Sequence, residues 1–213
     1  MEHVKFTQMT DGDVEDYTFL REHEITYAAE TGQRLIDAMA GLAEGYSGYQ
    51  ISRLGHSLQS ATRAWYDGAD IDWVVAALLH DIGDLYAPYM HGEYAATILK
   101  PYIREQCVWT VEHHGVFQKI YYADKLGERP NGREVHRGHP YFDDCAAFCE
   151  RWDQASFDPG YATLSLDFFE PLVLEVFARK TFDEAVMRPG AREPLVVPDV
   201  ALQRESGHVD VAV

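Results

Sequence analysis

The stretch that decides the fold of this chain is Leu78-Leu79-His80-Asp81-Ile82-Gly83-Asp84. It closes an apolar run over residues 73–79, which is typical of a buried helix. At the end of the run stand two strong metal ligands side by side, an imidazole that suits iron or zinc and a carboxylate that adds a hard oxygen. A His-Asp pair alone is equally compatible with a helix C-terminal cap. Its meaning therefore depends on the rest of the chain.

Working outward from this stretch, apolar residues recur at helical spacing in both directions. We predict helices over 13–42 with a possible break at Gly32, and over 51–65, 70–81, 91–99, 101–115, 116–126, 141–153 and 166–179. The glycine-rich segment 41–48 and the turn-rich segment 127–140 are predicted loops. No segment alternates as a strand would. The sequence predicts an all-α, single-domain helical bundle: a tail over 1–12, a core over 13–188 and an irregular tail over 189–213.

The bulk composition limits the class of partner. With 213 residues, of which 46% are hydrophobic, the chain is large enough for a real core. Its net charge of −17 argues against nucleic acid and against anionic membrane surfaces, since both need a basic partner. Three cysteines, an odd number without a signal peptide, indicate reduced thiols and a cytoplasmic protein. We expect a small-molecule substrate; the oligomeric state stays open.

Further histidines and aspartates lie on other predicted helices. In a helical bundle, side chains from separate helices can point inward at a shared metal. A single histidine is more often an ordinary core or surface residue, so the signal is the joint set. The candidate metal ligands are His56, His80, Asp81, His91, His113 or His114, and Asp153.

This order of ligands resembles the HD-domain superfamily of metalloproteins over residues 50–175. The resemblance implies that one metal binds His56, His80, Asp81 and Asp153, and that a second binds His91 and His114, with Asp81 bridging the two. His114 is preferred to His113 because it directly precedes the family-like segment 115–118. Six protein ligands leave positions open for water, substrate or O₂, as a catalytic site requires.

Dinuclear members of this superfamily divide into phosphohydrolases and a smaller branch of mixed-valent diiron oxygenases. Segments 54–61 and 76–83 look most like the phosphonate-cleaving oxygenases, and Tyr46 matches a tyrosine of that branch. The resemblance implies an oxygenase that holds two iron ions (Fe²⁺/Fe³⁺) and uses O₂ to cleave a small hydroxylated substrate. The alternative is a phosphohydrolase acting on a phosphoester or nucleotide with Mn²⁺, Co²⁺ or Mg²⁺. A non-catalytic sensor is a third class.

Departures from the branch mark further candidate catalytic residues. Tyr49 replaces a glutamate that ligates iron, so it is either a phenolate ligand or a hydrophobic lid. Asp84 replaces a basic residue that contacts substrate, and either suits a cationic or polyol group or is a solvated cap. Gln118 stands where a lysine is expected, with Lys119 beside it. Tyr46, which matches the branch, is also a candidate catalytic residue. Asp84, Gln118 and Glu150, which stands where the branch has a basic anchor, together make an amino-hydroxyalkylphosphonate substrate doubtful.

Few basic residues lie near the motifs, whereas nucleotide sites usually gather several around their phosphates. Those present are Arg53, Arg63, Lys119 and Arg151. The small number of basic residues makes a phosphohydrolase less favoured. It stays a possible function because bound metals can balance much of a phosphate's charge.

Overall fold

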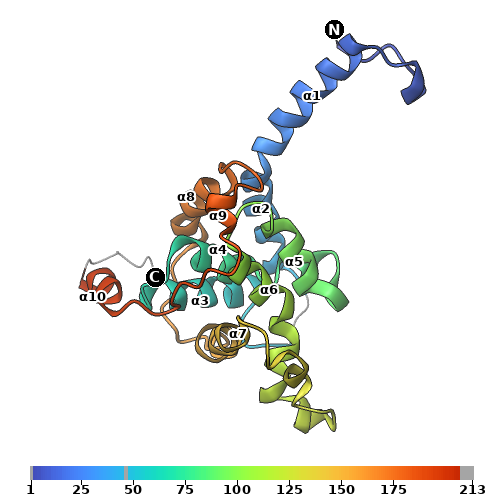
Figure 1. Cartoon of the computed structure of the whole chain (residues 1–213). Coiled ribbons are helices and arrows are strands. Elements are labelled where there is room, and N and C mark those ends of the chain that lie inside the picture. Colours follow the sequence, from blue (N-terminus) through green and yellow to red (C-terminus); the bar gives the residue numbers. More distant parts are fainter. Residues whose placement is uncertain (1, 46–47, 207–213) are drawn as a thin grey trace.

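A computed structural model describes residues 2–45 and 48–206, and the predicted all-α class is confirmed over them, without a strand. Figure 1 shows the helices gathered around α4 (Ile71–Leu79), while α1 (Val14–Ala29) projects from the body. Residues 72–79 of α4 are all buried. A helix that is apolar on every side is stable only in the middle of a bundle, and this one forms the centre of a single domain.

The candidate site is built from helices that contact α4 directly or through a neighbouring helix. The helix α3 (Arg53–Tyr66) packs directly against α4, and α6 (Glu105–Gln118) also contacts it. On its outer sides α6 pairs with α5 (His91–Leu99) and with α7 (Phe142–Phe148). A π-helical turn, η8 (Cys149–Asp153), continues α7 and packs against α3. The remaining face of α4 is covered by α8 (Leu166–Phe177), which also packs on α2 (Thr31–Ala40).

Polar side chains set where two of these helices begin. Asp70 caps α4 by accepting a hydrogen bond from the backbone N–H of Trp73 at 3.1 Å. The buried carboxylate of Asp72 accepts one from the backbone N–H of Arg104 at 3.0 Å. Residues 101–104 therefore form a turn, and α6 begins at Glu105 rather than at Pro101 as predicted.

Short helical turns precede α1 and connect the main helices. They are η1 (Met9–Asp11), η2 (Gly41–Ala43), η3 (Ile82–Leu85), η4 (Pro88–Met90), η5 (Lys119–Tyr121), η6 (Ala123–Leu126), η7 (Gly132–His136) and α9 (Glu184–Met187). Two of them, η2 and η7, lie in segments predicted as loops. The break in the first predicted helix falls at Glu30, not at Gly32, because Gly32 is buried in α2 against Phe177 of α8.

The C-terminal segment corrects the prediction of an irregular tail. Residues Pro198–Ser206 form a helix, α10, which packs against α3. The guanidinium of Arg204 lies 3.6 Å from the ring centre of Trp65 and donates to the backbone carbonyls of Trp65 and Ala69. These tertiary contacts hold α10 against α3. The division into tail, core and tail stays a prediction.

The three cysteines, Cys107, Cys145 and Cys149, are free and buried. Within the part of the chain that the structure describes, every helix is too short or too polar to cross a membrane.

Candidate metal centre

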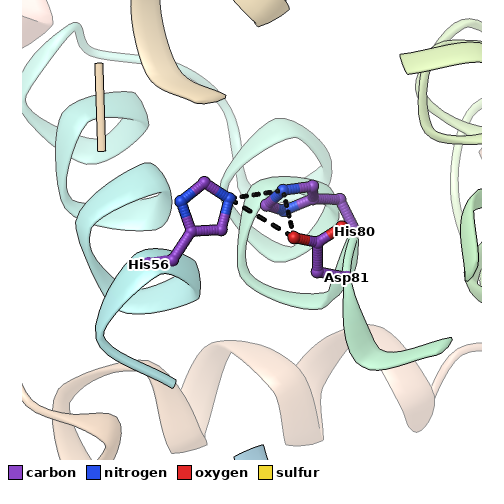
Figure 2. A group of neighbouring side chains, drawn as sticks. All are labelled: His56, His80 and Asp81. Carbon is purple, nitrogen blue, oxygen red and sulfur yellow. Dashed lines mark hydrogen bonds and ion pairs between the residues drawn. The ribbon is translucent and has the colours of Figure 1, made fainter. Parts of the chain in front are cut away.

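The structure brings the six predicted ligands together from five parts of the chain. His56 lies in the first turn of α3, His80 and Asp81 directly follow α4, and His91 opens α5. His114 lies in α6, and Asp153 ends the π-helical turn after α7. Their ligand atoms form three overlapping groups, each within 4.8 Å: His56, His80 and Asp81; His80, His114 and Asp153; Asp81, His91 and His114. Figure 2 shows the first group, with both imidazoles turned toward the carboxylate.

All four imidazoles are held in the same tautomer. Each Nδ1 atom faces a backbone carbonyl oxygen, which only accepts hydrogen bonds, so in the neutral ring Nδ1 carries the proton and Nε2 presents its lone pair. The four contacts are His56 to Ser156 at 2.9 Å, His80 to Ala77 at 2.8 Å, His91 to Pro88 at 3.2 Å and His114 to Val111 at 2.6 Å. This is the arrangement that fixes metal-binding histidines in proteins.

The lone pairs meet in two pairs of rings. Nε2 of His56 lies 3.1 Å from Nε2 of His80, and Nε2 of His91 lies 3.2 Å from Nε2 of His114. Asp153 is fully buried, and both its carboxylate oxygens lack a hydrogen-bond donor among the described residues. Its Oδ1 atom lies 3.2 Å from Nε2 of His56. Nitrogen lone pairs that point at one another beside a buried carboxylate without a hydrogen-bond donor are stabilised by a cation. This set of donor atoms therefore fits a metal ion.

Asp81 joins the two halves of the cluster. Its Oδ2 atom lies 3.4 Å from Nε2 of His56 and 3.4 Å from Nε2 of His80. Its other oxygen, Oδ1, lies 3.3 Å from Nε2 of His114 and 3.6 Å from Nε2 of His91. One carboxylate thus offers one oxygen to each half, which is the geometry of a bridging ligand.

The electrostatics of the cluster favour positive charge at its centre. Burial disfavours a charged imidazole, but the carboxylates of Asp153 and Asp81 outweigh it and raise the pKa of His56 to about 10. Burial would also raise the pKa of Asp81, yet His80, His114 and His56 hold that pKa well below its ordinary value. Burial opposes ionisation of Asp153 as well, yet His56 and His80 lower its pKa. Both carboxylates are therefore ionised, and without a metal they attract protons to the rings instead.

A pocket of about 530 Å³ opens onto this cluster at His56, Asp81 and His91. Three aromatic side chains line it: Tyr49, Tyr122 and Phe157. The ring of Phe157 stacks on His56 at 4.4 Å and packs against Tyr49 at 4.8 Å between centres. The polar residues of the lining are Arg53, Gln118 and Lys125. A small molecule can therefore reach Asp81 from solvent.

The predicted catalytic residues divide between this pocket and its surroundings. Tyr49 and Gln118 line it. Lys119 instead lines a neighbouring pocket and forms an ion pair with Glu128 at 3.2 Å. Asp84 lies outside the lining and pairs with Arg53. Tyr46 falls outside the described residues.

His113 lies apart from the cluster. Its ring stacks on Trp109 with 4.3 Å between centres, and its Nδ1 atom donates to the carbonyl of Trp109 at 2.9 Å. The neighbouring His114 is fully buried and faces Asp81. The geometry thus agrees with the choice of His114 as the candidate ligand.

Two glycines that position the ligands were not predicted from the sequence. A Cβ atom on Gly83 would lie 2.4 Å from the carbonyl oxygen of His91, so η3 and α5 can approach only because this side chain is absent. A Cβ atom on Gly92 would lie 2.8 Å from the carbonyl oxygen of Val111 in α6. The available signal was their position, two residues after Asp81 and next to His91.

Comparison with known proteins agrees with the fold and the cluster. The family model of the HD domain matches residues 53–138, a stretch that contains every candidate ligand except Asp153. No curated protein matches the chain. The match supports the resemblance to the HD superfamily over residues 53–138, and the His/Asp cluster is compatible with metal binding.

Proposed function

We propose that the protein is a diiron oxygenase that uses O₂ to cleave a small hydroxylated substrate oxidatively. The observation that carries the proposal is the two-sided cluster around Asp81, with two imidazoles on each side and Asp153 on one. Imidazole nitrogen with a few carboxylate oxygens is a donor set that suits iron. The likeness of segments 54–61 and 76–83 to oxygenases of this superfamily gives further support.

Iron bound at this cluster would supply a binding place for O₂ and the electrons that its reduction needs. The protein's own part is to fix the geometry. Carbonyl oxygens opposite the four Nδ1 atoms hold the rings in place, and Asp81 sets the spacing of the two halves. Phe157 covers one ring and keeps water from that side, while the amide of Gln118 offers hydrogen bonds to a substrate hydroxyl.

The pocket matches a small substrate. Its volume of about 530 Å³ lies within the range usual for small-molecule sites. The acidic composition further favours a small molecule over nucleic acid as the partner.

The direct test is purification from iron-supplemented cells, followed by metal analysis, EPR spectroscopy and measurement of O₂ consumption with hydroxylated compounds. We expect two iron ions per chain and a mixed-valent diiron signal. Protein that holds only manganese, magnesium or zinc and hydrolyses phosphoesters would refute the oxygenase proposal.

A phosphohydrolase is the second candidate, and Arg53 favours it. Its guanidinium lies 2.6 Å from Oδ2 of Asp81, at a place where a metal-bound phosphate would need a positive charge. A panel of nucleotides and phosphomonoesters with Mn²⁺, Co²⁺ or Mg²⁺ tests it. Release of phosphate by wild-type protein, abolished by Asp81→Asn, would establish this activity.

A further inference from the structure

The helix α1 receives little support from the rest of the fold. It projects from the body in Figure 1, and the helix that it packs against is α2. Residues 21–30 are all exposed. A single helix of this length is only marginally stable in water, because most of the stability of a protein helix comes from packing one of its faces. A partner along α1 would therefore stabilise it.

The residues before α1 hold its first turns only. Asp13 and Asp16 form a reciprocal capping box. The backbone N–H of Lys5 donates to Oδ1 of Asp16 at 2.9 Å, and the ring of Phe6 stacks on Tyr17 with 5.5 Å between centres. The helix is thus fixed at its start by this segment and at its end by α2, while the middle stays open to a partner.

One face of this open helix is apolar. The spacing from Val14 through Tyr17, Arg21 and Ile25 to Ala28 is three or four residues at each step, which puts these side chains on one side of a helix. Val14 is 83% exposed and Ile25 is 61% exposed. Apolar side chains at this spacing are the pattern by which one helix packs against another.

The same face is hollowed in its N-terminal half. The hollow has a volume of about 480 Å³. The residues that line it are Gly12, Asp13, Val14, Tyr17, Thr18 and Arg21. An aliphatic side chain from a second helix can lie in this hollow.

The charges on this face complement those of a second copy. Arg21 and Glu24 are exposed, and neither forms an ion pair within the described residues. In an antiparallel pair of α1 helices with a twofold axis near their middle, Arg21 can lie beside the partner's Glu24, and the symmetry repeats this contact. The same register sets Tyr17 opposite the partner's Ala28 and directs Ile25 at the partner's hollow.

We propose that α1 is a dimerisation arm that packs antiparallel against α1 of a second copy of this chain. A register centred on Arg21 itself is disfavoured, because it would set the two guanidinium groups against each other. The interface does not depend on the chemistry of the metal centre.

A projecting arm also suits the charge of the chain. Two bodies that each carry a net charge of −17 repel one another. The helix is about 24 Å long at 1.5 Å per residue, and an antiparallel pair places the bodies at its opposite ends. This length exceeds the Debye length of about 8 Å at physiological ionic strength, so most of the repulsion between the bodies is screened.

The test is sedimentation velocity on the full-length chain from micromolar to near-millimolar concentration. We expect a reversible monomer–dimer equilibrium for the wild type. Ile25→Glu should weaken dimerisation about tenfold or more, because it places an unpaired carboxylate in the apolar contact. The matched control is Thr26→Glu, which adds the same charge on another side of the helix and should dimerise like wild type.

Charge reversal separates a direct contact from damage to the fold. Arg21→Glu and Glu24→Arg should each weaken dimerisation, since each variant sets like charges against each other twice. An equimolar mixture of the two variants should form heterodimers, because both pairs are then again of opposite sign.

Three results would overturn the proposal. The first is a wild type that stays monomeric over the whole concentration range. The second is a dimer that Ile25→Glu leaves as stable as wild type. The third is a mixture of Arg21→Glu and Glu24→Arg that associates no better than either variant alone.

Discussion

Nε2 of His56 lies 3.1 Å from Nε2 of His80, while the Nδ1 atom of each ring donates to a backbone carbonyl. Both rings therefore direct a lone pair into the same small volume, beside the buried carboxylate of Asp153. An arrangement of this kind is costly unless a cation occupies the volume. The folded chain therefore holds these groups where a bound cation would stabilise them.

Metal binding should accordingly stabilise the fold. A ligand that binds only the native state adds about 4 kcal/mol at a free concentration 1,000 times its dissociation constant. For a chain of this size we expect a rise in melting temperature of about 8–16 °C. Differential scanning calorimetry of chelator-treated protein, with and without added Fe²⁺, Mn²⁺ or Zn²⁺, measures the change.

The control for this experiment is Asp153→Asn, which keeps the shape of the side chain but removes its charge. Its response to metal should be clearly smaller than that of wild type. Identical melting temperatures of wild-type protein with and without all three metals would show that the cluster binds none of them.

The adjacent pair His113 and His114 allows a matched test of the second half of the site. His114 faces Oδ1 of Asp81 at 3.3 Å, whereas His113 stacks on Trp109. We expect His114→Gln to retain about one metal per chain, and His113→Gln to retain two like wild type, because only His114 contributes a ligand atom. Elemental analysis after dialysis measures this ratio. Loss of metal from His113→Gln but not from His114→Gln would contradict the prediction and assign the ligand to His113.

Much of this candidate site could be proposed from the sequence because the type and order of its histidines and aspartates resemble those of the HD superfamily. The apolar run before His80 and the spacing from His56 to Asp153 can be read directly from the sequence. The pairing of Arg53 with Asp84 is not, because 31 residues separate them and no local pattern links them. The same holds for α10, whose place depends on the contact of Arg204 with Trp65.

The helix boundaries that were predicted wrongly also have tertiary causes. A glycine inside a helical pattern ordinarily suggests a break, but Gly32 stays helical because α8 packs closely against it. Proline at position 101 is a good helix start, yet the start of α6 is set by the bond between Arg104 and Asp72. Local propensity is decisive only where no buried contact competes with it.

Gly83→Ala should damage both stability and the metal centre. The added methyl group would lie 2.4 Å from the carbonyl oxygen and 2.5 Å from the Cα atom of His91, so η3 and α5 must move apart. Overpacking of this kind costs about 1–3 kcal/mol, and the shift would carry His91 away from Asp81. Urea unfolding gives the stability and elemental analysis gives the metal content.

Gly138→Ala is the matched control, because a Cβ atom at Gly138 meets nothing within 4 Å. This variant should unfold like wild type. Equal stability and equal metal content for Gly83→Ala and wild type would mean that the close approach of η3 to α5 does not position His91.

Tyr49→Phe addresses whether the phenol is an iron ligand or part of the pocket wall. Tyr49 is half-exposed, and its ring packs on Phe157, which in turn stacks on His56. We expect the variant to bind as much iron as wild type and to show the same visible absorption, because the ring and not the hydroxyl makes the contact. Tyr49→Ala, which removes the aromatic contact worth about 0.5–1.5 kcal/mol, should instead raise KM up to about tenfold. Disappearance of a visible absorption band in iron-loaded Tyr49→Phe, together with weaker iron binding, would establish the phenolate as a ligand.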